Sequence, residues 1–369
     1  MDIPLAMDSL QIRGFRAFDD LRVPRLGRVN LVVGKNNVGK SSFLEALWLY
    51  ALQGAPSVIW QILESRDEGR TPRLGRPRDN QTAASVVKTL FYGRQEIDRH
   101  LGSIQIGALD SAEKLISISV GWYLVQTDEE GGRQLKLFQA DDENGEDHPV
   151  LAVAIRCGSQ QEIVRRMDRR PYASQETESE RCVFVGANGL TAVEIGQLWD
   201  SIVLTDLEED VLRSVRIIAP DVERLTLVNS PYGATAQGRI AKAKMGSFFD
   251  PIPLRSLGEG MNRLFGMSLA LVSSKNGLLL IDEVESGLHY SVQPDVWRLI
   301  FETAHRLNVQ VFATTHSMDC IEAFQQAAED NQEEEGVLIR LKNQKGQIVV
   351  TEFDERRLGI ATREEIEVR

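Results

Sequence analysis

A loop near the amino end of the chain has the residue types and the spacing that bind polyphosphate. Residues 31–42 read Leu-Val-Val-Gly-Lys-Asn-Asn-Val-Gly-Lys-Ser-Ser: a short apolar strand, a loop of the form G-x-x-x-x-G-K-S and the start of a helix. In such a loop, backbone N–H groups and the helix amino end surround the phosphates. The lysine bridges the β- and γ-phosphates, and the following hydroxyl holds Mg²⁺. We expect Lys40 and Ser41 to have these roles; an ordinary glycine turn before a helix is the alternative interpretation.

Two carboxylates close a second apolar strand in the other half of the chain. Residues 278–281 are Leu-Leu-Leu-Ile, and Asp282 and Glu283 follow them directly. Ligands of open α/β sheets bind at the carboxyl ends of the strands. Asp282 is therefore expected to reach Mg²⁺, and Glu283 to orient or deprotonate an attacking water. His316 follows the next apolar strand and is expected to sense the γ-phosphate, with a structural histidine as the alternative.

A second glycine-bearing turn precedes the acid pair. The residues Ser256-Leu257-Gly258-Glu259-Gly260 stand at the start of a helix predicted over 256–273. This arrangement predicts another phosphate-binding helix amino end. Because no second phosphate-binding loop accompanies it, we expect it to serve a nucleotide held by another copy of the chain. The alternative is a simple helix cap with Ser256 as the capping residue.

The composition excludes several classes of protein. The chain has 369 residues, of which 42% are hydrophobic and 26% charged, and no apolar run approaches the roughly 20 residues of a membrane span. Its net charge of −12 provides no overall attraction to nucleic acid. Cys157, Cys182 and Cys320 form no C-x-x-C pair, which argues against a disulfide framework or a zinc site. With an amino end that lacks a basic signal-peptide segment, these thiols predict a cytoplasmic location.

Hydrophobic periodicity predicts the elements that must position these residues. In the amino-terminal half we expect a strand over 9–18, a turn at Asp19–Asp20, a short strand to Val23, a strand over 29–33, a helix over 41–52 and meander strands over 115–120, 121–126 and 133–138. Further strands are expected at 150–155, 182–185 and 224–229, with helices over 191–218 broken near Thr205, where Thr205 and Glu208 resemble a capping box. In the last part we expect strands at 277–281 and 309–313, helices at 292–307 and 318–328, and a hairpin around Lys345–Gly346.

Two groups of arginines lie in polar segments. Arg70, Arg73, Arg76 and Arg78 fall in a loop predicted over 64–82, and a second group occupies residues 165–170. A solvated surface is the favoured interpretation of both groups. Contact with a nucleic-acid backbone is the alternative.

On its motifs the chain resembles the ABC-type ATPase heads of the RecF, SMC and OLD (overcoming lysogenization defect) group. Residues 34–42 are similar to the Walker A motif of that group, and Leu280–Glu283 are similar to its Walker B motif. Residues 256–260 resemble the signature motif that closes over a partner's ATP, and His316 resembles the switch histidine. Residues 14–18 resemble the opening strand-turn of the group, which lies close to the nucleotide.

The resemblance implies ATP and Mg²⁺ as cofactors and assigns the site residues. These are Glu283 and His316 as catalytic residues; Gly34, Lys35, Asn36, Asn37, Gly39, Lys40, Ser41, Ser42 and Arg16 for the nucleotide; Ser256, Gly258, Glu259 and Gly260 for the nucleotide of a partner; and Ser41 and Asp282 for the metal. His289 replaces the usual aspartate of the D-loop, as in the OLD-like branch. The Q-loop glutamine is not placed, and Gln105 and Gln126 are its candidates.

The implied fold is α/β: a P-loop NTPase of the ABC-head type, with two lobes around a mixed central sheet, antiparallel amino-terminal strands and a partly helical insertion. The expected divisions are an amino-terminal ATPase lobe at 1–150, the insertion at 151–250, a carboxyl-terminal ATPase lobe at 251–345, and a terminal strand with a charged tail at 346–369. No Asp-x-Asp pair occurs, so the TOPRIM nuclease of OLD proteins is not expected. The chain thus resembles a free-standing OLD-like AAA ATPase.

Three hypotheses for the function follow. The favoured one is an ATPase whose ATP-driven homodimerisation regulates a separate effector, a nuclease or toxin, plausibly in phage defence. The second is a RecF-like DNA-repair ATPase that would bind DNA through the two arginine groups. The third is a transporter ATPase subunit, which would need a membrane partner; the amino-terminal strand-turn and His289 speak against it.

Overall fold

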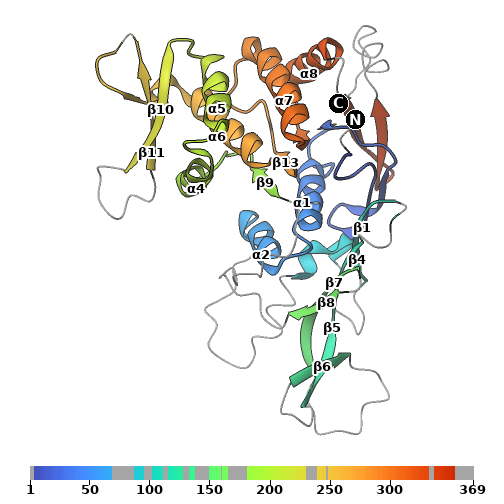
Figure 1. Cartoon of the computed structure of the whole chain (residues 1–369). Coiled ribbons are helices and arrows are strands. Elements are labelled where there is room, and N and C mark those ends of the chain that lie inside the picture. The colour runs from blue at the N-terminus through green and yellow to red at the C-terminus, as the bar shows by residue number, and fades with distance from the viewer. Residues whose placement is uncertain are drawn as a thin grey trace.

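A mixed six-stranded sheet forms the centre of the molecule (Figure 1). The computed structural model describes residues 4–68, 87–94, 102–109, 111, 115–127, 133–137, 149–158, 160–164, 181–229, 239–246, 248–331 and 336–353. The strand order is β16-β15-β3-β14-β13-β9, with β3 at Val29–Val33, β9 at Cys182–Val185, β13 at Leu278–Ile281, β14 at Gln310–Thr314, β15 at Gly336–Gln344 and β16 at Gln347–Phe353. All neighbours pair in parallel except β15 and β16. The carboxyl ends of β3, β13 and β14 therefore meet at one edge.

A second, antiparallel sheet contains the amino-terminal strands. Its main path is β2-β1-β4-β5-β7-β8, and β6 pairs with β5 off that path. The strands are β1 at Leu10–Phe15, β2 at Phe18–Val23, β4 at Ile104–Gly107, β5 at Ile116–Thr127, β6 at Arg133–Leu137, β7 at Val150–Cys157 and β8 at Gln160–Val164. The β5–β6 end of this sheet extends away from the centre, at the bottom of Figure 1.

Helices cover both faces of the central sheet. Helix α1 (Lys40–Ala51) lies between the two sheets, where its buried Phe43 and Leu47 share one core cluster with Ile12 and Ile118. Helices α6 (Glu259–Ser273), α7 (Gln293–Leu307) and α8 (Met318–Asp330) contribute to the cluster on the opposite face. The short helix α2 (Pro56–Ser65) packs against α1. This burial on both faces explains why the central strands are continuous apolar runs.

A smaller unit packs on α6 at the left of Figure 1. It consists of helices α4 (Ala192–Ile202) and α5 (Leu207–Arg216) and a three-stranded sheet of β10 (Val222–Asn229), β11 (Arg239–Met245) and β12 (Ile252–Pro253). Short 3-10 helices stand at Lys88–Leu90, Tyr92–Arg94, Leu254–Leu257 and Tyr290–Val292. Among the helices within the described ranges, none combines the length and the hydropathy needed to cross a lipid bilayer.

The structure confirms the expected fold class and most of the predicted elements. Strand β3, helix α1, strands β9 and β13 and the β15–β16 hairpin lie where the sequence predicts them. The hairpin turn has positive φ at Lys345 (52°) and Gly346 (90°), as a two-residue turn between twisted strands requires. The divisions near 150, 250 and 345 stay predictions. Strand β9, from the range predicted as an insertion, forms the edge of the central sheet.

Several local predictions are wrong. The first turn lies at Arg16–Ala17, and Asp19 and Asp20 belong to β2, where they point outward while Phe18 and Leu21 are buried. The strands predicted at 115–120 and 121–126 form one strand, β5, because it pairs with β7 from Ile116 to Tyr123 and with β6 from Tyr123 to Thr127. Helix α2 was not predicted. Its first residue, Pro56, is suited to a helix start.

Other differences between the prediction and the structure concern the residues at which helices begin. At the start of α5 the cap position falls on Asp206, whose side chain makes no cap hydrogen bond. The predicted pair still contributes there: the Thr205 hydroxyl accepts the N–H of Leu207 at 3.3 Å, and Glu208 accepts the N–H of Leu204 at 3.1 Å. A complete capping box, which was not predicted, is formed by Thr191 and Glu194 at the start of α4.

Helix α6 begins at Glu259, with Gly258 as its cap residue, so Ser256 lies in the preceding 3-10 helix and caps nothing. The arginines at 70–78 and 165–170 and the charged tail lie outside the described residues.

Candidate functional site

The carboxyl edge of the central sheet lines a cavity of about 430 Å³. We call it the Lys40 cavity; it is lined by Arg16, Ala17, Asn36, Asn37, Gly39, Lys40, Ser41, Ser42, Arg66, Thr89, Phe91, Arg94, Asp282, Glu283 and His316. The structure thus brings together the phosphate-binding loop, the acid pair and the histidine, which come from three separate parts of the chain. Gly34 and Lys35 belong to the same loop but do not line the cavity. The catalytic and binding roles of these residues stay predictions.

The glycines of the loop are required by packing as well as by its curvature. Gly34 has φ of 150°, and a Cβ there would lie 2.5 Å from the carbonyl oxygen of Leu341 on β15. Gly39 has φ of 97°, and its Cβ would lie 2.9 Å from Cζ of Phe18. The loop therefore fits closely between the two sheets, and any larger residue at either position would displace it.

Lys40 lies at the first position of α1 and its ammonium group rests on the loop. Its Nζ donates to the carbonyl oxygens of Gly34 at 2.7 Å and Lys35 at 3.3 Å. Burial lowers the pKa of Lys40, and the nearby carboxylates of Asp282, Glu283 and Glu285 oppose that effect. The ammonium group of Lys40 and the carboxylates of Asp282 and Glu283 therefore line the same cavity.

One hydroxyl group holds the acid pair. Thr314, fully buried at the end of β14, donates to Oδ1 of Asp282 at 2.5 Å and accepts the backbone N–H of Glu283 at 2.9 Å. The backbone N–H of Asp282 in turn donates to the carbonyl oxygen of Val185 on β9 at 2.8 Å. Both acids are thus oriented by neighbouring parallel strands. Sequence analysis did not identify Thr314 as functional; its place directly at the end of a strand was the available signal.

His316 is paired with a carboxylate. Its backbone N–H donates to Oε1 of Glu285 at 3.2 Å, and its Nδ1 lies 3.5 Å from the same oxygen. Half of the His316 side chain is exposed, whereas that of Glu285 is 11% exposed. Glu285 therefore orients the histidine from the buried side. Sequence analysis missed this role, although a third acid two positions after Glu283 was visible in the chain.

A cluster of ion pairs around the buried side chains of Arg16 and Glu45 joins the cavity to the antiparallel sheet. Nε of Arg16 lies 2.8 Å from Oε2 of Glu45, and its Nη1 donates to Glu68 at 3.1 Å. Arg66 donates to the other oxygen of Glu45 at 2.7 Å, and Arg94 donates to Glu68 at 2.9 Å. Burial lowers the pKa of Arg16 and raises that of Glu45, and in each case the ion-pair partners oppose the effect.

The residues present fit a nucleotide and a magnesium ion. No side chain caps the amino end of α1, so the N–H groups of its first turn are available to an anion. Nη2 of Arg16 is buried and has no hydrogen-bond acceptor, although this residue lines the cavity. Within the described ranges, no cluster of three or more His, Cys, Asp or Glu side chains could hold a metal. Ser41 and Asp282, the predicted metal ligands, both line the cavity, and a magnesium ion held there would need phosphate oxygens as further ligands.

The second glycine turn lies apart from the Lys40 cavity. Ser256, Gly258 and Glu259 are exposed, and none of them lines the Lys40 cavity of their own chain. Of the Q-loop candidates, Gln105 lies in β4 and donates to Ser103, and Gln126 lies in β5. Gln105 does not line the Lys40 cavity. Two other carboxamide side chains, those of Asn188 after β9 and Gln197 on α4, line a neighbouring cavity together with Ser41 and Asp282.

Comparisons with known proteins agree with this geometry. The family described as "AAA ATPase domain" matches residues 6–55, which contain Arg16 and the phosphate-binding loop. The family described as "AAA domain, putative AbiEii toxin, Type IV TA system" matches residues 245–321, which contain the second glycine turn, the acid pair and His316. A Helicobacter pylori protein named "ATP/GTP phosphatase" is 23% identical over 345 residues, covering 87% of this chain and 88% of that protein.

Solved structures show the same fold. An SMC head bound to the C-terminal winged-helix domain of ScpA matches with a TM-score of 0.50 at 15% identity, over 95% of this chain and 98% of that chain. An SMC head with an extended coiled coil, bound to the C-terminal domain of ScpA derived from Pyrococcus furiosus, matches with a TM-score of 0.50 at 13% identity, over 98% of this chain and 99% of that chain. The chain therefore has the SMC-head-like fold of P-loop ATPases.

Proposed function

We propose that this chain binds ATP with Mg²⁺ in the Lys40 cavity and hydrolyses it with Glu283 as the general base. One observation carries the proposal: the uncapped amino end of α1, Lys40, the acid pair and His316 all line one cavity, although they come from distant parts of the chain. An ammonium group opposite paired carboxylates is an arrangement suited to phosphoryl transfer.

In the proposed site, the positively charged groups bind the phosphates and the carboxylates act on the metal ion and the water. Lys40, Arg16 and the amino end of α1 bind the negative phosphates, and Ser41 and Asp282 hold the magnesium ion. Bound Mg²⁺ supplies positive charge that neutralises the phosphate oxygens. Glu283 orients a water and accepts its proton, while Thr314 keeps both acids in place. His316, oriented by Glu285, lies where it can contact the terminal phosphate.

A head-to-tail homodimer completes the proposed site. Ser256, Gly258, Glu259 and Gly260 stand at the amino end of α6, which no side chain caps. They lie on the surface instead of in the cavity of their own chain, which supports a role at the nucleotide of a partner copy. ATP would therefore be bound between two chains, and its hydrolysis would release them.

The proposed biological role is regulation of a separate effector, a nuclease or toxin, in phage defence by an OLD-like cytoplasmic ATPase. The family that matches residues 245–321 is described as an AAA domain and putative toxin of a type IV TA system, which supports a toxin-related role. The alternative is a RecF-like ATPase that binds DNA. Its expected contacts, the arginines at 70–78 and 165–170, lie outside the described residues. Steep salt dependence of DNA binding would favour that alternative.

Phosphate release from Mg-ATP tests the enzymatic part of the proposal. We expect steady release by the unchanged chain and a loss of about 100-fold or more in Lys40→Ala, because the ammonium group stabilises charge at the transferred phosphoryl group. Lys275→Ala, which alters an exposed lysine after α6, is the matched control and should behave like the unchanged chain. Activity that survives Lys40→Ala would remove this proposal.

A further inference from the structure

We infer that Arg263 is a positioning residue that holds the Glu283 turn and joins it to the amino end of α6. The inference rests on the proposed function, in which Glu283 acts on the attacking water. The side chain of Arg263, on helix α6, points away from the Ser256–Gly260 turn and into the molecule. No contact between Arg263 and a nucleotide is needed for this role.

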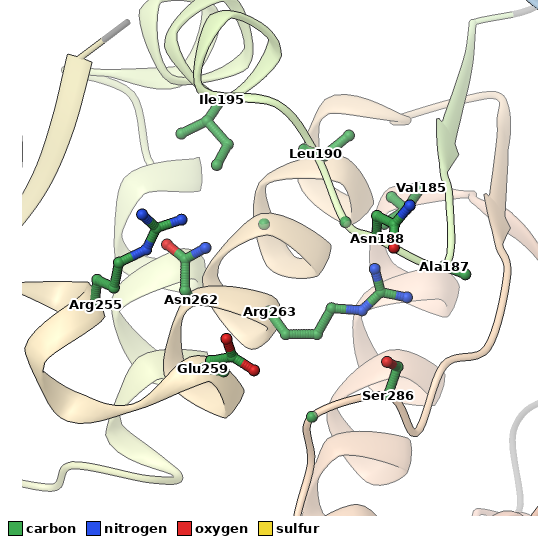
Figure 2. Close-up of a pocket in the computed structure, with 13 residues that line it drawn as sticks. Val185, Ala187, Asn188, Leu190, Ile195, Arg255, Glu259, Asn262, Arg263 and Ser286 are labelled. Carbon is green, nitrogen blue, oxygen red and sulfur yellow. The ribbon is translucent and has the colours of Figure 1, made fainter. Parts of the chain in front are cut away.

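The guanidinium group of Arg263 binds three backbone carbonyl groups from two segments. Its Nη1 donates to Gly186 at 2.7 Å, and its Nη2 donates to Asp282 at 2.8 Å and to Glu283 at 3.1 Å. Arg263 as a whole is 8% exposed. Figure 2 shows its side chain reaching from α6 toward the segment that carries Ala187 and Asn188, with Ser286 nearby. It therefore connects α6, the end of β9 and the acid pair.

The turn that Arg263 binds needs support. Glu283 has φ of 50°, a left-handed conformation that is unfavourable for a residue with a side chain. Its N–H donates to the hydroxyl of Thr314, and its carbonyl oxygen accepts from Arg263 and from the N–H of Ser286 at 3.0 Å. The next N–H, that of Val284, donates to the carbonyl oxygen of Thr314 at 3.1 Å. Arg263 is the contact that ties this hydrogen-bonded turn to α6, and without it we expect the turn to loosen and the Glu283 carboxylate to be less well directed.

An arginine is suited to this task and a lysine is not. The planar guanidinium reaches several acceptors in fixed directions, whereas an ammonium group is a single point. Gly189, with φ of 79°, lies beside it: a Cβ there would be in ordinary contact with Nη1, at 3.4 Å. Burial lowers the pKa of Arg263, and Asp282, Glu283 and Glu285 oppose that effect. The charged group therefore stays beside the acids without pairing directly with their carboxylates.

The same region joins α6 to the segment after the acids. A Cβ on Gly260 would lie 2.6 Å from the carbonyl oxygen of Gly287, so the first turn of α6 packs directly on that backbone. With Arg263 one turn further along the helix, a displacement of the Ser256–Gly260 surface is transmitted to Glu283 of the same chain. A partner that binds this surface would thus adjust the acid of the chain it covers.

Kinetics and binding together test this role. In Arg263→Lys we expect kcat to fall about tenfold, and in Arg263→Gln about 100-fold, because small misplacements of a catalytic group cost rate. The affinity for Mg-ATP, measured by calorimetry, and the KM should change less than about twofold, because the lost contact acts only on the chemical step. Arg298→Lys, in an exposed ion pair on α7, is the matched control and should leave kcat unchanged.

A second readout does not depend on activity. Hydrogen exchange of the peptide spanning residues 282–287 should quicken in Arg263→Gln and not in Arg298→Lys. Unchanged kcat and unchanged exchange in folded Arg263→Gln would overturn the inference, and so would equal losses of binding, kcat and overall stability. The proposed function has its own test: it is wrong if the unchanged chain releases no phosphate or if Lys40→Ala remains active. In that case the hydrogen-exchange measurement still decides whether Arg263 holds the turn.

Discussion

The amino ends of α1 and α6 share a preceding glycine of positive φ but differ in its ψ, 18° at Gly39 and 164° at Gly258, and in their surroundings. Each helix follows a glycine with positive φ, 97° at Gly39 and 104° at Gly258, and no side chain caps either end. A Cβ on Gly39 would collide with Phe18, whereas a Cβ on Gly258 would meet nothing within 4 Å. The first helix end lies in the Lys40 cavity opposite the acids, and the second lies on the surface.

This difference leads us to expect that the α1 end works within a single chain and that the α6 end needs a second copy. The end of α1 has its lysine, its acids and its histidine supplied by the same chain. The end of α6 has no side-chain cap, and it lines a separate cavity with Arg255 and Asn262 instead of facing the acids. The first should therefore bind a nucleotide in a single copy, and the second should act only after two copies meet.

The largest effect should come from removing the proposed base at the α1 site. Glu283→Gln keeps the size and the hydrogen bonds of the turn but cannot accept a proton, so we expect kcat to fall about 1,000-fold. Binding of Mg-ATP should persist, and light scattering should show a dimer that stays closed in ATP. A variant that stays monomeric in ATP would contradict the sandwich arrangement, and normal turnover would contradict the role of Glu283.

The next effect should come from blocking the α6 end. Ser256→Arg places a long charged side chain on the exposed turn, so we expect dimerisation with ATP to be lost and turnover to fall about 100-fold. Binding of Mg-ATP to the single chain should be unchanged. Ser201→Arg, on the exposed end of α4, is the matched control. If Ser256→Arg dimerises and turns over normally, the two helix ends do not meet.

A smaller effect should follow from loosening the acid pair. Thr314→Val removes the hydroxyl that contacts both acids while keeping the shape of the side chain, so we expect kcat to fall about tenfold and stability to fall by about 1–3 kcal/mol. Thr314→Ser restores the hydroxyl and should recover most of both. Equal behaviour of Val and Ser at this position would show that the hydroxyl does not orient the acids.

The smallest effect on turnover should come from the ion pairs behind α1. Glu45→Gln leaves buried Arg16 with only Glu68, so we expect the free energy of unfolding to fall by about 3 kcal/mol. Turnover at low temperature should change little once the protein is folded. Denaturant unfolding measures the loss, with exposed Glu302→Gln on α7 as the control. If the free energy of unfolding does not fall, the ion pairs of Glu45 add no net stability. Glu45 would then not be what holds Arg16 in place.

Regions with strong local signals were predictable, and regions set by pairing were not. The strand, loop and helix around Lys40 lie as expected because the glycines, the apolar run and the helix face are all local. The extent of β5 was missed because pairing with β7 and β6, which are distant in the chain from its start, determines it. The start of α6 was misplaced because Gly258, and not the capping-type residue Ser256, takes the cap position.

The sequence by itself determined that a phosphate-binding loop, an acid pair and a glycine turn exist, because each motif is a run of neighbouring residues. Only the tertiary structure decided which of them share a cavity, since parallel pairing of β3, β14 and β13 brings their ends to one edge. It also decided the supporting contacts. Thr314, Glu285 and Arg263 act on residues distant in the chain, and no local spacing links them to those partners.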